Sequence, residues 1–355
     1  MSYLSNFMFC VTLGLAPVMG LPSAALAQET GTQDTQEAAQ SAAVARVVAD
    51  YLPPALDGFV TASEALERAV AQECAGPATQ AAFHDAFDAW LAVQPLTLAG
   101  FDHGTTGTAI SFWPDKKGAI PRTLAGLIAD EDPVIADAAA FAEVSIAARG
   151  LFAMEMLLFD PQFAPLEAGS YACDLLDAQA RDLMRMAQEM RAIWFDAGGY
   201  ADALTEAGGP NATLFFSPRE AAQALYTVLT ATLTHDRDQR LGRPMGTFER
   251  PRPIRAEARR SERAAANLTG SLAAMERLTA ALSDGAAVET KAALDRAIAQ
   301  IEALDDADFS DADDLGQRFE MEVAQQSIST AMHNAANEIG TRLGVSAGFN
   351  AGDGD

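Results

Sequence analysis

The chain has 355 residues, and its 49 acidic side chains outnumber its 24 basic ones, which gives a formal net charge of −25 at pH 7. A protein this acidic repels nucleic acid and anionic lipid surfaces, so neither is expected as a partner. Hydrophobic residues make up 49% of the chain, which is long enough to bury a sizeable core and large for a single helical bundle.

The N-terminus has the pattern of an export signal. The first 27 residues contain no Asp, Glu, Lys or Arg, and the mostly apolar stretch Phe7–Leu21 precedes Ala25-Leu26-Ala27, a small-residue cleavage pattern. We therefore predict a secretory signal peptide over residues 1–27. The apolar stretch is shorter than the roughly 20 residues that a membrane helix needs, so no stable membrane span is expected.

The remainder of the chain has helical periodicity. Residues 28–37 are polar and lack an apolar period, which predicts a flexible lead. Beyond them the sequence is alanine-rich, and no convincing run of alternating β-branched residues interrupts it. The predicted fold class is all-α, with helices near residues 38–52, 55–73, 77–94, 121–131, 134–158, 172–197, 218–240, 256–283, 287–304 and 315–343.

Two packed helical-bundle domains are the natural arrangement for so many helices. We place the first at residues 38–205 and the second at 206–350, with a tail at 351–355. The boundary falls in the Gly- and Pro-containing stretch 198–217. The next helix has a clear start at Ser217-Pro218-Arg219-Glu220, because Ser is a natural N-cap, Pro suits the first helical position and Glu is at N3.

Two cysteines, Cys74 and Cys173, remain once the signal peptide is removed. In an oxidising compartment they allow one intramolecular disulfide, which we predict. Two separately buried thiols are the alternative. The spacing of cysteines and histidines does not match a structural zinc site.

One short motif carries the most information about function. Gly150-Leu151-Phe152-Ala153-Met154-Glu155 places Phe152 and Glu155 on the same face of a helix. Together with Phe112–Gly118, Arg240–Pro244 and Leu343–Asn350, this motif resembles the imelysin family, whose motif reads Gly-x-His-x-x-Glu. Phe152 takes the place of the histidine. The resemblance extends from about residue 40 to 350.

The resemblance implies two helical-bundle domains with a functional site near their interface. Glu155 is then the surviving motif residue that could bind a metal, either iron or another divalent ion, because a phenylalanine supplies no ligand. No catalytic residue is assigned. The motif and pocket residues that we expect are Gly150, Phe152, Glu155, Trp113, Asp115, Lys117, Arg149, His103, His235, Arg240 and Arg243.

A core helix is the alternative interpretation of the motif. It would have an apolar line along Ala148, Phe152 and Phe159, and a buried Glu155 paired with an arginine. Arg149 does not face Glu155, because six residues along a helix rotate by about 240°. The partners expected for Glu155 come from other elements and are Arg122, Lys117, His235 and Arg240.

The four histidines form no local pair at metal-ligand spacing. His103 belongs to a long irregular segment, which favours a site residue, with an ordinary surface loop as the alternative. His235 follows an apolar helix, where a role at the helix end is at least as well supported as metal ligation.

Basic residues gather in one segment, because nine arginines lie between Arg237 and Arg263. The segment could bind an anion. Since acidic residues are interspersed there, we favour ion pairs that hold a loop and a helix start against the acidic remainder.

The sequence therefore predicts a periplasmic imelysin-like protein that acts as a non-catalytic binding or accessory component of iron-linked uptake or homeostasis. The iron link, and possible periplasmic iron- or haem-related partner proteins, follow from the resemblance. A metallopeptidase of the imelysin type is the main alternative, and an interaction module without a ligand is a third. Hydrolase nucleophile and phosphate-loop motifs are not found in the sequence.

Overall fold

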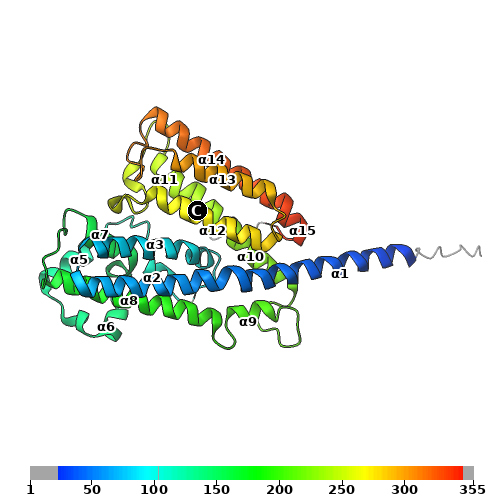
Figure 1. The fold of residues 1–355 in the computed structure, drawn as a ribbon, viewed down its shortest axis with the longest axis horizontal. Coiled ribbons are helices and arrows are strands. Elements are labelled where there is room, and N and C mark those ends of the chain that lie inside the picture. The colour runs from blue at the N-terminus through cyan, green and yellow to red at the C-terminus, as the bar shows by residue number, and fades with distance from the viewer. Residues whose placement is uncertain (1–22, 103, 347–355) are drawn as a thin grey trace, which may run out of the picture.

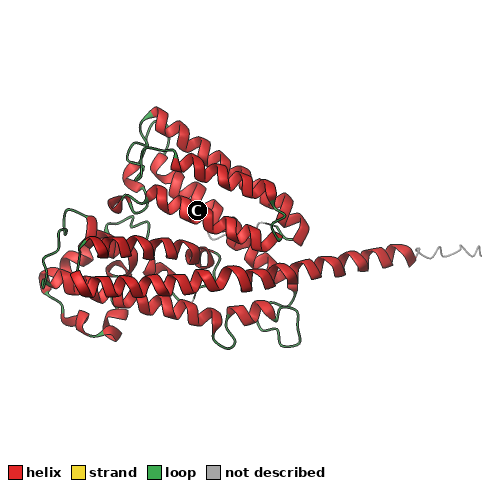
Figure 2. Ribbon diagram, viewed as in Figure 1, coloured by secondary structure: helices red, strands yellow, loops and turns green. Residues whose placement is uncertain are grey.

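The computed structural model describes residues 23–102 and 104–346. These residues form helices joined by turns and loops, without a strand (Figure 2). The predicted all-α class is confirmed. None of the described helices is both long and apolar enough to cross a bilayer. The longer helices are α1 (Ser23–Arg46), α2 (Leu52–Glu73), α3 (Pro77–Leu98), α5 (Ala119–Asp130), α7 (Gly150–Phe159), α8 (Tyr171–Phe195), α10 (Pro218–His235), α12 (Ala264–Ser283), α13 (Val288–Glu302) and α14 (Leu315–Ala335).

Helices α2, α3 and α8 form one layer, and α7 packs against α8 and the end of α3 (Figure 1). Their apolar residues meet at helical spacing, as with Phe59 of α2 and Trp90 of α3, which are both fully buried with ring centroids 5.2 Å apart. A disulfide between Cys74 and Cys173 joins the end of α2 to the start of α8. The predicted cysteine pairing is therefore present.

Helices α10, α12, α13 and α14 build the C-terminal half (Figure 1). Helix α12 contacts α13 and α14 belongs to the same layer, while α12 also packs across α3 of the N-terminal half. The contact with α3 is close, because a Cβ added at Gly270 would lie 2.8 Å from Cδ1 of Leu91. The buried apolar residues of both halves form one continuous core.

The N-terminal helix differs from the sequence prediction. Helix α1 begins at Ser23, so residues 28–37, for which a flexible lead was predicted, belong to this helix. It packs against α9 (Tyr200–Thr205), α10, α12 and α15 (Thr341–Leu343), and Nε2 of Gln40 donates a hydrogen bond to the carbonyl of Leu343. The predicted cleavage point after residue 27 lies within this helix. Residues 1–22 of the predicted signal peptide and the 351–355 tail lie outside the described residues.

Several predicted helices are shorter than expected. The range 134–158 contains a 3₁₀ turn (Pro133–Ala136), α6 (Ala138–Ala142), a second 3₁₀ turn (Ile146–Ala148) and then α7. Asp137 and Ser145 interrupt it because their side chains accept hydrogen bonds from the backbone N–H groups that follow them. In the range 256–283 a 3₁₀ turn (Arg259–Ser261) comes first, and the α-helix begins only at Ala264. Helix α10 ends at His235, and a π-helical segment, Asp236–Leu241, continues the chain into α11 (Gly242–Met245).

The start of α10 is as predicted. Ser217 Oγ accepts a hydrogen bond from the N–H of Glu220 at 3.2 Å, and Oε2 of Glu220 accepts one from the N–H of Phe216 at 2.6 Å. These reciprocal bonds satisfy N–H groups that have no partner within the helix. The stretch 198–217, in which a domain boundary was placed, contains α9 and the loop that leads into α10.

Candidate functional site

Helix α7 carries the motif, and a close backbone approach fixes its start. Gly150 has φ +72°, and an added Cβ would lie 2.1 Å from the carbonyl oxygen of Ala109 and 2.4 Å from that of Ile110. A side chain at this position would therefore be excluded by both backbone conformation and space. The motif glycine brings α7 against α4 (Thr106–Ile110), just before the loop that contains Trp113.

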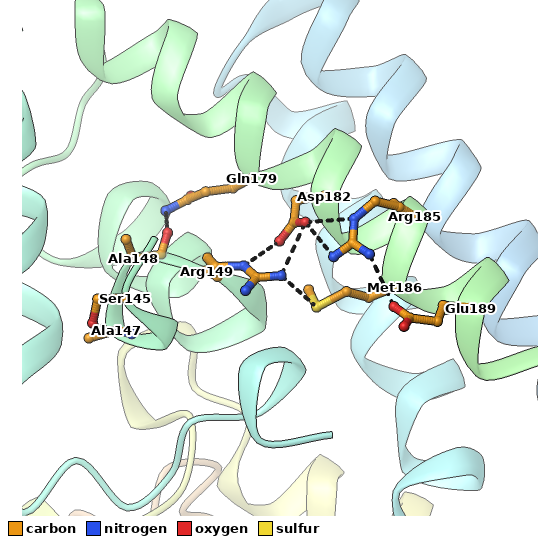
Figure 3. Close-up of polar contacts among 9 residues, drawn as sticks. All are labelled: Ser145, Ala147, Ala148, Arg149, Gln179, Asp182, Arg185, Met186 and Glu189. Atoms are coloured by element: carbon orange, nitrogen blue, oxygen red, sulfur yellow. Dashed lines mark hydrogen bonds and ion pairs between the residues drawn. The ribbon is translucent and has the colours of Figure 1, made fainter. Parts of the chain in front are cut away.

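Arg149, which precedes Gly150, fixes α7 to α8 (Figure 3). Its Nε donates to Oδ2 of Asp182 at 2.7 Å, and its Nη2 donates to Oδ1 of the same carboxylate at 3.3 Å. Arg185 also donates to Asp182, and Nε2 of Gln179 donates to the carbonyl of Ala148 at 2.8 Å. Arg149 therefore has a positioning role. Its ion pair is with Asp182 and not with Glu155, in agreement with the helical rotation that places Arg149 and Glu155 on different faces.

Phe152 is 4% exposed and packs edge-on against Phe87 of α3, with ring centroids 5.6 Å apart. This packing agrees with the core-helix interpretation. Phe152 also contributes to the wall of a pocket, described below, so both interpretations of the residue hold in part.

Glu155 is 1% exposed and points to the segment that precedes α12. Its Oε1 accepts hydrogen bonds from the N–H and the hydroxyl of Ser261, at 3.1 and 2.9 Å. Burial raises the pKa of Glu155, while the Ser261 hydrogen bonds and the charge of Arg260 partly oppose that rise.

The partners predicted for Glu155 were wrong. Arg122 donates to the carbonyl of Lys117, and Arg240 belongs to a separate buried cluster. His235 and Lys117 form no hydrogen bond with Glu155 among the described contacts. The reason is that Glu155 faces the irregular segment before α12, where the sequence predicted a continuous helix.

The loop after α4 is held by Asp115. Its carboxylate accepts hydrogen bonds from the N–H groups of Lys117, Ala119 and Ile120, at 3.3, 2.8 and 2.8 Å, and so caps α5. Lys117 is exposed. Asp115 thus has a structural role at the pocket edge.

Trp113 of this loop reaches the C-terminal half. The guanidinium of Arg243 lies 5.4 Å from the centre of its ring, and the ring of His235 lies 6.0 Å away in an edge-on orientation. The Trp113–Pro114 peptide bond is cis. A cation over an indole face is a favourable arrangement.

Arg240 holds the centre of the polar cluster between the halves. Its Nε donates to Oε2 of Glu257 at 2.7 Å, its Nη1 donates to Oδ1 of Asp236 at 2.5 Å, and its Nη2 donates to Oε1 of Gln94 on α3. All three side chains that form the ion pairs are at most 1% exposed. Arg240 is a buried anchor and does not line the pocket.

His235 packs against Trp113 and does not line the pocket. Its Nε2 is buried and has no hydrogen-bond partner among the described residues. Burial, together with the charges of Arg240 and Arg243, lowers its pKa to about 3. His103, the other predicted site histidine, lies outside the described residues.

A pocket of about 580 Å³ opens where the Trp113 loop, α7 and the segment from Arg243 to Arg260 meet. It brings together five predicted site residues, and Gly150, Arg149, Lys117, His235 and Arg240 do not line it. No local motif distinguishes Lys116, Arg255, Arg259 or Arg260 in the sequence, although the density of arginines indicates the segment of the last three. The lining consists of Phe112, Trp113, Pro114, Asp115, Lys116, Gly118, Ile120, Pro121, Phe152, Glu155, Met156, Arg243, Ile254, Arg255, Ala256, Ala258, Arg259 and Arg260.

The arginines of the arginine-rich segment differ in their surroundings, and Arg250 and Arg252 neither line the pocket nor form an ion pair with a described residue. Four of its nine arginines form ion pairs, as expected, and these are Arg237, Arg240, Arg260 and Arg263. Arg243, Arg255 and Arg259 line the pocket and form no ion pair with a described residue. The ion-pair interpretation therefore accounts for only part of the segment.

The side chains of this pocket do not fit a bare metal cation. The lining offers two carboxylates and no imidazole or thiolate, and the carboxylate of Asp115 is occupied by backbone N–H groups. Four arginines and Lys116 surround them, which repels a cation. Within the described residues, no group of three or more His, Cys, Asp or Glu side chains is arranged to hold a metal.

Comparisons with known proteins agree with this architecture. An imelysin-like protein from Psychrobacter arcticum 273-4 has a similar structure, with a TM-score of 0.66, 16% identity, and coverage of 88% of this chain and 98% of that one. A putative iron-regulated protein A precursor from Parabacteroides distasonis ATCC 8503 has a TM-score of 0.64, 15% identity, and coverage of 85% and 95%. At these identities the likeness shows the fold.

No curated protein matches the chain. The model of the family described as Imelysin matches residues 47–338, which include the Trp113 loop, the motif helix and the arginine-rich segment. This chain therefore belongs to the imelysin family.

Proposed function

We propose that this chain is a binding protein without catalytic turnover, and an accessory component of iron-linked uptake or homeostasis in the periplasm. One observation carries the binding role. Arg255 and Arg259 line a pocket of about 580 Å³ beside Trp113 and have no ion-pair partner among the described residues. Cations and aromatic surface without a protein partner are what a ligand site offers.

The iron link rests on the family. The Parabacteroides neighbour is a putative iron-regulated protein A precursor. A precursor form is consistent with the export that residues 1–27 predict for this chain. Because the pocket does not suit a bare cation, iron would reach it together with a ligand. Periplasmic iron- or haem-related proteins are the partners that this role implies.

The test is the content of the protein isolated from the periplasm without chelators or a histidine tag. After denaturation, released small molecules and iron are quantified for the wild type, for Arg259→Gln, and for Arg296→Gln on the exposed face of α13 as a charge-matched control. We expect a near-stoichiometric ligand in the wild type and the control, and depletion in Arg259→Gln. A wild-type protein that carries neither iron nor a small molecule would contradict the proposal.

Peptidase activity is tested on the same preparation with an unfolded protein substrate. A ligand-binding protein leaves the substrate intact with and without a chelator. Cleavage that a chelator stops and Glu155→Gln abolishes would establish the metallopeptidase instead.

A further inference from the structure

The charge of the pocket lining is opposite in sign to the net charge of the whole chain. The chain carries a formal net charge of −25, yet the pocket lining has five cationic side chains against two acidic ones. One of those two, Asp115, caps α5, and the other, Glu155, is buried and bound to Ser261. A concentrated positive site within an acidic protein selects an anion from solution.

Of the four pocket arginines, Arg260 is paired with Asp160, and the other three, Arg243, Arg255 and Arg259, form no ion pair with a described residue. Nε of Arg243 is buried and has no hydrogen-bond partner among the described residues. Nη1 of the same guanidinium donates a hydrogen bond to Oε1 of Gln239 at 3.2 Å. Burial and the nearby charge of Arg255 lower the pKa of Arg243. The positive charges of Arg243 and Arg255 repel each other, and an anion bound between them would relieve that repulsion.

The rest of the lining is apolar and favours an organic ligand. The ring of Trp113 faces Arg243, Phe152 and Met156 form a buried wall, and Ile254 is 72% exposed although it borders the pocket. The volume of about 580 Å³ suits a ligand much larger than an inorganic ion. A small inorganic anion would leave this apolar surface uncovered.

We propose that the ligand of this pocket is an organic polycarboxylate, bound through the guanidinium groups of Arg243, Arg255 and Arg259, either as the free acid anion or as its ferric chelate. The inference rests on the proposed binding function. Planar guanidinium groups match carboxylates with two parallel hydrogen bonds, and several carboxylates on one carbon skeleton would engage several arginines. Ferric iron prefers oxygen ligands, so a polycarboxylate can supply the metal ligands that the pocket lacks.

Tryptophan fluorescence provides a direct test. The chain has three tryptophans, and Trp90 and Trp194 are fully buried, so quenching by ions in solution reports on Trp113. We expect iodide to quench this emission more strongly than caesium, although the whole protein repels anions. Citrate should protect Trp113 from iodide, and inorganic phosphate at the same concentration should protect it less.

Calorimetric titration with citrate, ferric citrate and inorganic phosphate then shows whether the pocket binds the free polycarboxylate, its ferric chelate or any anion. Arg255→Gln and Arg259→Gln should each weaken citrate binding by about tenfold to a hundredfold, the loss expected for a charge-assisted hydrogen bond, and Arg296→Gln should not. Thermal melting checks folding, which these variants should retain because neither arginine has an ion-pair partner in the described part of the chain. Tighter binding of ferric citrate than of citrate would identify the chelate as the ligand, and the reverse would identify the free acid.

Three outcomes would overturn the inference: no binding of either citrate species, equal binding of phosphate, or citrate binding that the arginine variants leave unchanged. These outcomes differ from a failure of the binding function itself. If the periplasmic protein carries a ligand without carboxylates, the binding function stands and the polycarboxylate class is wrong. If it carries no ligand and no probe binds, both fail.

Discussion

Glu155 on α7 accepts two hydrogen bonds on one oxygen from Ser261, a residue 106 positions later that lies in the segment leading to α12. This contact ties the motif helix of the N-terminal half to the arginine-rich segment of the C-terminal half. Both sides of the contact are adjacent to the pocket, since Glu155 and Arg260 line it. The motif glutamate therefore helps to shape the pocket without a histidine at position 152.

Glu155→Gln should change how stability depends on pH. Because burial raises the pKa of Glu155 in the folded state, the protonated form is favoured by folding. Its contribution to stability is complete below the ordinary glutamate pKa and is lost as the pH rises through the raised folded-state value. Chemical denaturation of the wild type and Glu155→Gln should show the wild type losing stability relative to the variant as the pH rises. Parallel profiles would contradict the burial effect.

Ser261→Ala provides the companion measurement. Removal of the hydroxyl leaves a buried carboxylate with one fewer donor, which costs about 1–3 kcal/mol of unfolding free energy. In the Glu155→Gln background the same change should cost less, since an amide needs the donor less than a carboxylate does. A double-mutant cycle isolates this coupling.

The sequence predicted the elements that depend on local pattern. The all-α class, the N-cap at Ser217 and the pairing of Cys74 with Cys173 follow from apolar periodicity, capping chemistry and the number of cysteines. The interruptions between residues 134 and 158 were not predicted, because alanine-rich sequence fits a helix well. The sequence does not show whether the side chains of Asp137 and Ser145 accept hydrogen bonds from the backbone and so interrupt the helix, as they do here.

The candidate site could be predicted only in part, because its contacts join segments that are far apart in the sequence. The Trp113 loop, the motif and Arg243 meet at one pocket. That this pocket is the functional site stays a prediction. The partner of Glu155 could not be predicted, because Ser261 lies in a non-helical segment whose course depends on tertiary contacts. Likewise, nothing in a run of arginines distinguishes Arg240, which is buried and paired, from Arg259, which lines the pocket.

Gly150→Ala should destabilise the fold strongly. Its φ of +72° strains an alanine, and the new Cβ would lie 2.1 Å from the carbonyl oxygen of Ala109. We expect a loss of about 1–3 kcal/mol from the backbone strain, with the clash adding to it. Gly126→Ala is the matched control, since Gly126 is inside α5 with no atom within 4 Å of an added Cβ, and it should stabilise by about 0.5–1 kcal/mol. Urea denaturation measures both, and equal effects would contradict the close approach.

Substitutions around Asp182 should have unequal effects. Asp182→Leu leaves Arg149, whose side chain is 8% exposed, without its carboxylate, and we expect a loss of about 3–5 kcal/mol. Arg185→Met removes the other ion pair of Asp182, whose arginine is 42% exposed, and should cost about 1 kcal/mol or less. Denaturation midpoints for the two variants compare them directly. A cost for Arg185→Met that matches the cost of Asp182→Leu would show that Arg149 is not the main partner.

His235→Phe should flatten the acid side of the stability profile. Burial and the charges of Arg240 and Arg243 lower the pKa of His235 to about 3, so the neutral ring is favoured by folding. Its contribution is complete above the ordinary histidine pKa of 6.5 and is lost as the pH falls from 6.5 through 3. One proton bound on unfolding gives a slope of up to about 1.4 kcal/mol per pH unit, which the wild type should show relative to His235→Phe between pH 6 and 5. Phenylalanine keeps an aromatic ring beside Trp113, so the packing of the two rings is retained while the titrating nitrogens are removed. A wild-type profile parallel to that of the variant over this range would mean that the imidazole takes up its proton at the same pH in the native and unfolded states, and that burial does not lower the pKa of His235.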